Sequence, residues 1–117
     1  MNAYDPIKLR EYLAQVLADG DARSCGMYLQ TLAQKQDKIL FSAFENILQN
    51  ALLTELEKYV LCATEDIFTL GHTNHYHAVS KHFGISDKSV IDRIHKQALS
   101  KIRLYQRTNR TLDALLT

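Results

Sequence analysis

Nine polar and charged side chains between residues 81 and 103 are the part of this chain best suited to chemistry with a ligand. Lys88 and Arg93 can donate hydrogen bonds to guanine acceptors, and Ser89 can contact a base or a phosphate. Asp92 can accept from a cytosine amine, or it can pair with Lys88 or Lys96 at helical spacing. The full set, which predicts a nucleic-acid-binding surface, is Lys81, Ser86, Lys88, Ser89, Asp92, Arg93, Lys96, Lys101 and Arg103.

The last three side chains of this set suit contacts with the phosphate backbone, whereas the earlier ones on the helix suit contacts with bases. Lys96, Lys101 and Arg103 lie farther along the chain, where a helix would meet the phosphate backbone and position the protein without reading sequence. A helix N-terminus near Ser86 would also suit a phosphate.

The charge distribution supports this interpretation better than the total charge does. The chain has 117 residues and a formal net charge of only +1. Residues 1–80 hold six Lys/Arg and ten Asp/Glu, a balance of −4, whereas residues 81–117 hold eight Lys/Arg and three Asp/Glu, a balance of +5. A basic C-terminal third is typical of a phosphate-facing surface, although a solvated helix face would have the same composition.

Other kinds of site have less support. His72, His75 and His77, with His82 nearby, could bind zinc or nickel, but no cysteine or carboxylate completes a ligand set locally, so we expect no metal and no cofactor. There is no glycine-rich phosphate loop and no nucleophile motif, and no histidine is placed to activate Cys25, so we expect no enzyme.

The cysteines and the hydrophobicity of the chain indicate where the protein is located. Cys25 and Cys62 are far apart and flanked by small or apolar residues, so we expect both to be core side chains. No apolar run approaches the roughly 20 residues that cross a membrane, and the N-terminus lacks the pattern of a signal peptide. We expect a cytoplasmic protein with no membrane partner.

The elements that must position the nine side chains are two helices joined by a tight turn. The pattern predicts a helix over about residues 75–83, a turn through Gly84, and a long helix over about residues 87–106 with Ser86 or Asp87 as its cap. Apolar residues recur on one side of the long helix, which suits packing of that side on a core. This is the plan of a helix-turn-helix, whose second helix can enter the major groove of DNA.

The rest of the chain also predicts helices and no strands, so the expected fold class is all-α. Asp5 and Pro6 begin the first helix, and Asp19 and Gly20 end it. Further helices are expected over residues 24–34, from about Asp37, and from the capping box that Thr54 forms with Glu57. The expected apolar faces of these helices, including the first, contain Ile7, Leu9, Leu13, Val16, Leu17, Met27, Tyr28, Leu29, Leu32, Ile39, Leu40, Phe41, Phe44, Ile47 and Leu48. We expect a single domain: an N-terminal part (residues 1–52), a helix-turn-helix part (residues 53–107), and a tail or short docking helix (residues 108–117).

Three fragments of the second half resemble a known family. Residues 53–61, LTELEKYVL, resemble the opening of region 4 of bacterial RNA polymerase sigma factors. Residues 79–86, VSKHFGIS, resemble the first helix and turn of that region, and residues 98–103, ALSKIR, resemble its closing signature. LuxR-type regulators share the superfamily, but their connection before the helix-turn-helix is shorter. The resemblance covers about residues 53–103, and the second helix is one residue longer here than in the sigma pattern.

The resemblance implies a sequence-specific, DNA-binding transcription regulator of bacterial or phage type. Double-stranded promoter DNA would be its target, and RNA polymerase could be a partner. Residues 1–52 do not resemble the sigma region that melts promoter DNA, so a complete sigma factor is not expected. A homodimer is favoured because helix-turn-helix proteins gain affinity from two half-sites, with residues 1–52 as a dimerisation or partner face. The alternative is a protein-protein interaction module that docks on RNA polymerase or another regulator without binding DNA.

Overall fold

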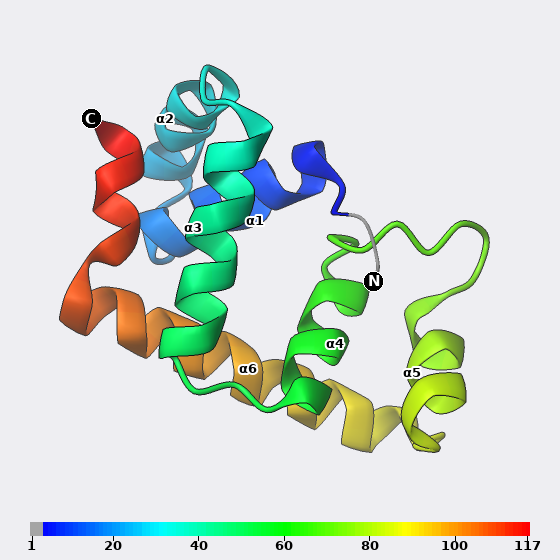
Figure 1. The fold of residues 1–117 in the computed structure, drawn as a ribbon. Helices are drawn as coiled ribbons and strands as arrows, with labels where there is room; N and C mark the ends of the chain where they lie inside the picture. The colour runs from blue at the N-terminus through cyan, green and yellow to red at the C-terminus, as the bar shows by residue number, and fades with distance from the viewer. Residues whose placement is uncertain (1–3) are drawn as a thin grey trace.

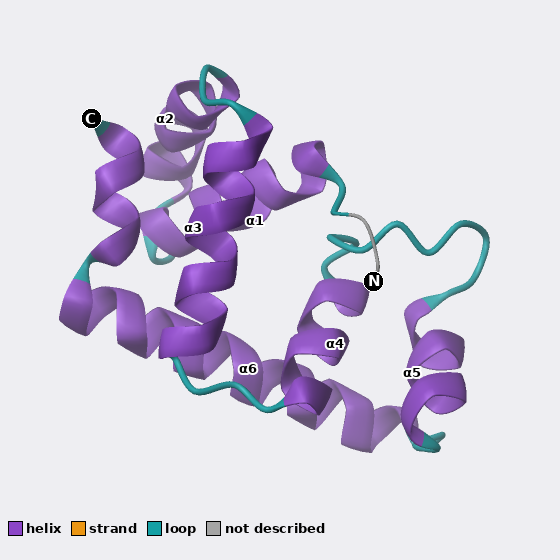
Figure 2. Ribbon diagram, in the orientation of Figure 1, coloured by secondary structure: helices purple, strands orange, loops and turns teal. Residues whose placement is uncertain are grey.

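The computed structural model describes residues 4–117, and these residues fold as an all-helical, compact unit (Figure 1, Figure 2). One antiparallel bridge, between Tyr4 and Phe68, is the extended pairing within the described residues. The expected all-α fold class is therefore confirmed. The elements are α1 (Pro6–Ala18), α2 (Ala22–Ala33), α3 (Asp37–Asn50), α4 (Glu55–Thr64), α5 (His75–Phe83), α6 (Lys88–Asn109) and the short 3-10 helix η1 (Thr111–Leu116).

Capping side chains set several of the helix boundaries, as the sequence predicts. The Asp5 carboxylate accepts from the backbone N–H of Ile7 at 2.9 Å, with Pro6 in the first turn of α1. At the start of α4, the Glu57 N–H donates to the Thr54 hydroxyl at 3.1 Å, and the Thr54 N–H donates to the Glu57 carboxylate at 2.9 Å. This reciprocal pair satisfies two backbone donors that have no partner within the helix.

Two expected boundaries are shifted. The second helix begins at Ala22 rather than at residue 24, because Asp21 caps it by accepting from the Arg23 N–H. The long helix begins at Lys88 and continues to Asn109, beyond the expected residue 106, until Arg110 takes a left-handed conformation with φ of 55°. The tail then forms η1, in which Leu112 and Leu115 are buried.

The main core lies between α1, the end of α2, α3, the C-terminal part of α4, the second half of α6, and η1. Its largest fully buried side chains include Leu9, Leu13, Leu32, Leu40, Phe44, Ile47, Leu61, Ile67, Ile102 and Leu112. Burial of such side chains is the main favourable contribution to the stability of the fold. Cys62 belongs to this core as expected, whereas Cys25 is only half-buried against its edge.

For four residues of the expected apolar faces, the prediction of a buried position is wrong. Ile7, Met27 and Ile39 are 67%, 57% and 47% exposed, and Leu29 is 36% exposed. The reason is that the packing neighbours of these helices do not cover the whole of each apolar face. In α2, Leu32 is the fully buried side chain, so the expected face is wider than the face that α1 and η1 cover.

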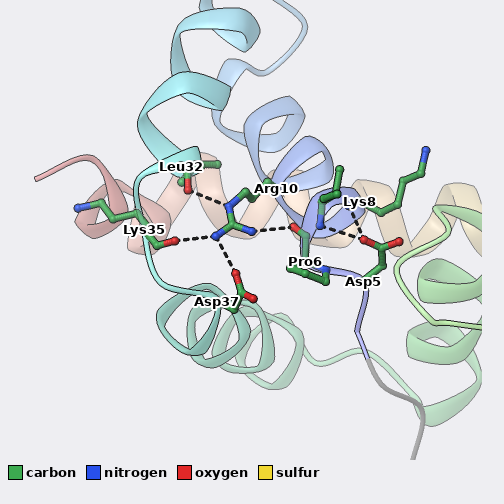
Figure 3. A network of polar contacts seen from close by, with 8 residues as sticks. Asp5, Pro6, Lys8, Arg10, Leu32, Lys35 and Asp37 are labelled. Carbon is green, nitrogen blue, oxygen red and sulfur yellow. Dashed lines mark hydrogen bonds and ion pairs between the residues drawn. The ribbon is translucent and has the colours of Figure 1, made fainter.

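Arg10 ties α1 to the connection between α2 and α3 (Figure 3). Its guanidinium donates to the carbonyl oxygens of Leu32, Lys35 and Pro6 at 3.0, 2.6 and 3.3 Å, and to the Asp37 carboxylate at 2.8 Å. These bonds satisfy backbone acceptors near the end of α2, where no further turn of helix can do so. A single side chain therefore fixes the relative placement of three N-terminal helices.

The long helix α6 belongs to both halves of the molecule. In Figure 1, α4 and α5 pack at its N-terminal end, while α3 lies across its C-terminal half and η1 continues beyond it. Ala98 and Ile102 enter the main core, and Ile91 enters a second, smaller core with Val60 and Val79.

Within residues 4–117, no helix combines the length and the apolar character that crossing a membrane requires.

Candidate nucleic-acid interface

Local capping interactions set the ends of α5 and the start of α6. Asn74 caps α5 by accepting from the His77 N–H at 2.9 Å, and Gly84 ends it with φ of 72°. That left-handed conformation is easy for glycine and strained for other residues. Asp87, rather than Ser86, caps α6 by accepting from the Ser89 N–H at 2.9 Å. The connection between the helices is therefore short and well defined.

A small apolar cluster holds α5 against α4 and α6. Val60, Val79 and Ile91 are fully buried in it, one from each helix, and Leu56, Tyr59, Tyr76, Ile85 and Ile94 pack around them. The Tyr59 ring also stacks on His82 of α5, with 4.5 Å between ring centroids. Because this cluster is separate from the main core, the three helices have packing of their own.

Tyr76 makes the principal polar link between α5 and α6. Its hydroxyl donates to the Asp92 carboxylate at 2.9 Å, and the Lys88 ammonium lies 5.2 Å from the centre of its ring. The hydrogen bond to Asp92 raises the pKa of Tyr76, so this hydroxyl keeps its proton. Of the two roles that the sequence leaves open for Asp92, the pairing with Lys88 or Lys96 is not formed among the described residues, and the carboxylate faces α5 instead.

The centre of the exposed side of α6 carries polar and basic residues in succession. Ser89, Arg93, Lys96, Gln97 and Ser100 are exposed. Apart from the adjacent pair Lys96 and Gln97, successive members are three or four residues apart, which places the row on one side of the helix. Within the described chain, Arg93 and Lys96 form no ion pair. From Ser89 to Ser100 this face spans roughly 16 Å at 1.5 Å per residue. Arg93 and Lys96 are thus free to meet a ligand.

A shallow depression lies beside this face. It has a volume of about 570 Å³ and is lined by Glu57, Arg93, Lys96, Gln97, Ser100 and Lys101. Gln97 and Ser100 are therefore part of the surface, although they are not among the nine predicted side chains. Their spacing of four and seven residues from Arg93 is the signal that could have found them.

Lys101, which the sequence predicts as a phosphate contact, is engaged in an ion pair within the chain. Its ammonium lies 2.8 Å from the Glu57 carboxylate, which is the same group that completes the cap of α4. Burial tends to raise the pKa of Glu57, but the bonds from Lys101 and Thr54 outweigh it and hold that pKa below its usual range. Lys101 therefore neutralises a buried carboxylate and ties α6 to α4.

Arg103 also lies away from the exposed centre of α6. It is half-buried and lines a cleft under the turn between α1 and α2, together with Gln15, Gly20 and Asp21. Its charge contributes to holding the pKa of Asp19 down, after the larger effect of a hydrogen bond from Arg107. The structure thus places Arg103 beside the N-terminal helices, apart from the other predicted residues.

The N-terminus of α6 is occupied by its own cap. The Asp87 carboxylate accepts from both the hydroxyl and the N–H of Ser89, and these bonds hold the pKa of Asp87 below its usual range. A carboxylate that stays ionised there repels a second anion, so the expected phosphate site near Ser86 is unfavourable. Ser86 is exposed on the turn, and Lys81 is exposed on α5.

Two histidines of α5 pack against aromatic rings. His75 lies 4.0 Å from the ring of Tyr76, and His82 stacks on Tyr59. Among residues 4–117, no three His, Cys, Asp or Glu side chains come together as a group that could hold a metal ion.

Burial raises the pKa of the Cys62 thiol to about 12, so this thiol is protonated at neutral pH.

Comparisons of the chain with protein-family models, with curated proteins and with solved structures found no match.

Proposed function

We propose that this chain is a DNA-binding transcription regulator that places the first half of α6 in the major groove of double-stranded promoter DNA. The observation that carries the proposal is the exposed row of Ser89, Arg93, Lys96, Gln97 and Ser100, with α5 fixed beside it. Arginine and lysine donate to guanine, glutamine pairs with adenine, and serine contacts a base or a phosphate. All five residues thus have chemistry that suits base edges.

The packing of α6 supports this use. Only one side of its first half is covered, by α4 and α5, so the opposite side can approach another molecule over several turns. A helix held by a rigid neighbour can enter a groove about 12 Å wide without reordering. Arg93 and Lys96 on the face, and Lys81 at its edge, would supply the attraction to phosphates.

We further propose that the chain acts as a homodimer, with RNA polymerase as a possible second partner at the promoter. The recognition face is short, and two copies on neighbouring half-sites would add their contacts. Exposed apolar side chains of the N-terminal part are available for such pairing. Leu52 is 79% exposed and holds a left-handed conformation with φ of 60°, and Ile7 and Met27 are also exposed.

The test is a gel-shift series across salt concentrations, using genomic fragments captured by the protein. A DNA-binding face gives a steep decrease of affinity with salt, because neutralised phosphates release counterions. An enriched motif made of two half-sites would support the dimer, as would light scattering at twice the chain mass of 13.4 kDa. Weak, salt-independent retention without an enriched motif would contradict DNA binding.

A specific observation favours protein docking as the second candidate. Leu104 continues the exposed side of α6 and is 63% exposed, close to Leu52 in a shallow depression of about 270 Å³. Two exposed leucines at one place are more typical of a protein contact than of a DNA contact. In this case Leu104→Ser would abolish binding of RNA polymerase or another regulator, while Arg93→Ala would not.

A further inference from the structure

An aromatic hollow lies beside α4. It has a volume of about 380 Å³, and five of its lining residues carry aromatic rings: Tyr4, Tyr59, Phe68, His82 and Phe83. Figure 1 shows α4 and α5 side by side, joined by a long loop, and the hollow takes residues from all three. Among the described residues that line it, none belongs to α6, so the proposed DNA contact does not use it.

The five rings hold one another in place and still have accessible surface. Phe68 stacks with Tyr4 at 6.1 Å between ring centroids and lies 5.4 Å from Tyr59. Tyr59 in turn lies 4.5 Å from His82 and 5.4 Å from Phe83. Three of these side chains are half-buried, and the two from α5 are exposed. A concave, aromatic-lined site of roughly 300–1,000 Å³ is typical of small-molecule binding.

The charges around the aromatic hollow do not favour an ion. Glu55 and Lys58 line it, and the carboxylate and the ammonium lie 3.1 Å apart, so their charges largely cancel. Leu48 and the protonated thiol of Cys62, both buried, close the hollow toward the main core. A cation would meet the charge of Lys58, and an anion would meet that of Glu55, whereas an uncharged molecule avoids both penalties.

We propose that the aromatic hollow binds a small, uncharged, planar aromatic molecule with a polar N–H or O–H edge. A flat ring packs on other aromatic rings by offset stacking or edge-to-face contact, which adds to simple apolar burial. Within residues 4–117, the Tyr59 hydroxyl and the His82 imidazole have no hydrogen-bond partner, so they can bond the polar edge of the ligand. The site is independent of the proposed DNA binding.

Indole is a suitable probe, because it is flat and uncharged and has one N–H at its edge. The chain contains no tryptophan, so the fluorescence of indole can be followed in the full chain without a protein signal of the same kind. A ligand of this size should saturate in roughly the micromolar to millimolar range. Cyclohexanol, which is not flat, should displace indole only at concentrations at least about fivefold higher. Tetramethylammonium, which is charged, should not displace it.

Three variants locate the bound indole. Phe83→Leu keeps an apolar side chain but removes the ring, and should weaken indole binding about fivefold. His82→Ala removes a ring and a hydrogen-bonding group, and should weaken it by about the same factor. Both side chains are exposed, so neither change should prevent folding. His77→Ala is the matched control and should bind like the parent, since His77 is exposed on the same helix but does not line the hollow.

Four results would overturn the proposal. Emission that does not saturate would show that there is no site. Displacement by cyclohexanol or tetramethylammonium as readily as by indole itself would show that flat, uncharged rings are not selected. Unchanged binding in both Phe83→Leu and His82→Ala would place indole elsewhere. Binding that disappears as the protein concentration rises would show that a second copy of the chain covers the hollow. All four are measured without DNA, so they are distinct from failure of the proposed function.

Discussion

The hydroxyl of Tyr76 donates a 2.9 Å hydrogen bond to the carboxylate of Asp92, and this bond fixes α5 against the edge of the exposed face of α6. It removes Asp92 from the set of groups that could read a base, because its carboxylate is already engaged. The same tyrosine ring lies under the Lys88 ammonium. One side chain therefore orients two of the nine residues that the sequence predicts as contacts.

Replacing Tyr76 by phenylalanine should lower the free energy of unfolding slightly, because one solvent-exposed hydrogen bond to a charged acceptor is lost. Urea unfolding followed by circular dichroism measures this change. Tyr28→Phe is the matched control, since Tyr28 is also half-buried and forms no hydrogen bond within the described chain. Equal stability of the two variants would show that the Tyr76 contact does not hold α5.

Arg93→Ala should weaken binding to a specific DNA site by about 1–3 kcal/mol and relax the preference for its sequence. The reason is that Arg93 is unpaired and central on the exposed face. Lys88→Ala should have a smaller effect, because Lys88 is turned toward Tyr76. Gel shifts on specific and scrambled fragments measure both. Lys38→Ala, an exposed lysine on α3, is the control for total charge. Parent-like binding by Arg93→Ala would contradict the proposed face.

Lys96→Ala and Lys101→Ala should separate binding from folding. Lys96 is unpaired, so its loss should weaken all DNA sequences equally and reduce the salt slope by about 1 without changing stability. Lys101 neutralises the buried Glu57, so its loss should lower the free energy of unfolding by about 1–2 kcal/mol. Calorimetry and gel shifts on the two variants check this. If Lys101→Ala keeps the parent stability, the ion pair does not support α4.

Gly84→Ala should destabilise the chain by about 1 kcal/mol, although there is open space around the added methyl group. The cause is the backbone alone, because φ is 72° at this position. Gly84→Asn should cost less, since asparagine tolerates this conformation better. Gly26→Ala is the opposite control: Gly26 lies inside α2 with open space, and alanine there should stabilise by about 1 kcal/mol.

Glu57 should make the stability of the chain depend on pH. Its pKa in the folded state lies below its value in the unfolded chain. The stabilisation is therefore complete above the unfolded pKa of about 4.3, and is lost as the pH falls through the folded pKa. Glu57→Gln should flatten unfolding curves measured from neutral to acidic pH. In a Lys101→Met background the same substitution should have less effect, because the partner is already absent. An unchanged slope in Glu57→Gln would contradict this.

Local signals predicted the local structure, and long-range contacts explain the errors. Asp5, the Thr54–Glu57 pair and Gly84 each act on backbone groups within a few residues, so the chain alone indicates them. The link from Lys101 to Glu57 joins residues 44 positions apart, and no spacing rule reveals it. The sequence therefore marks Lys101 and Arg103 as phosphate contacts on their basic character alone, because it does not show which side chains they meet in the fold.

The unbroken course of α6 has a mechanical consequence. At 1.5 Å per residue its 22 residues span roughly 33 Å, from the turn after α5 to the start of η1. Near its far end, Arg107 holds the Asp19 carboxylate at the end of α1 through two hydrogen bonds of 2.8 and 2.7 Å. Between these ends α6 also packs on α3 and α4, so the helix is held along its whole length. A bound molecule that tilted the first turns of α6 would therefore have to work against the main core and the Arg107–Asp19 pair together.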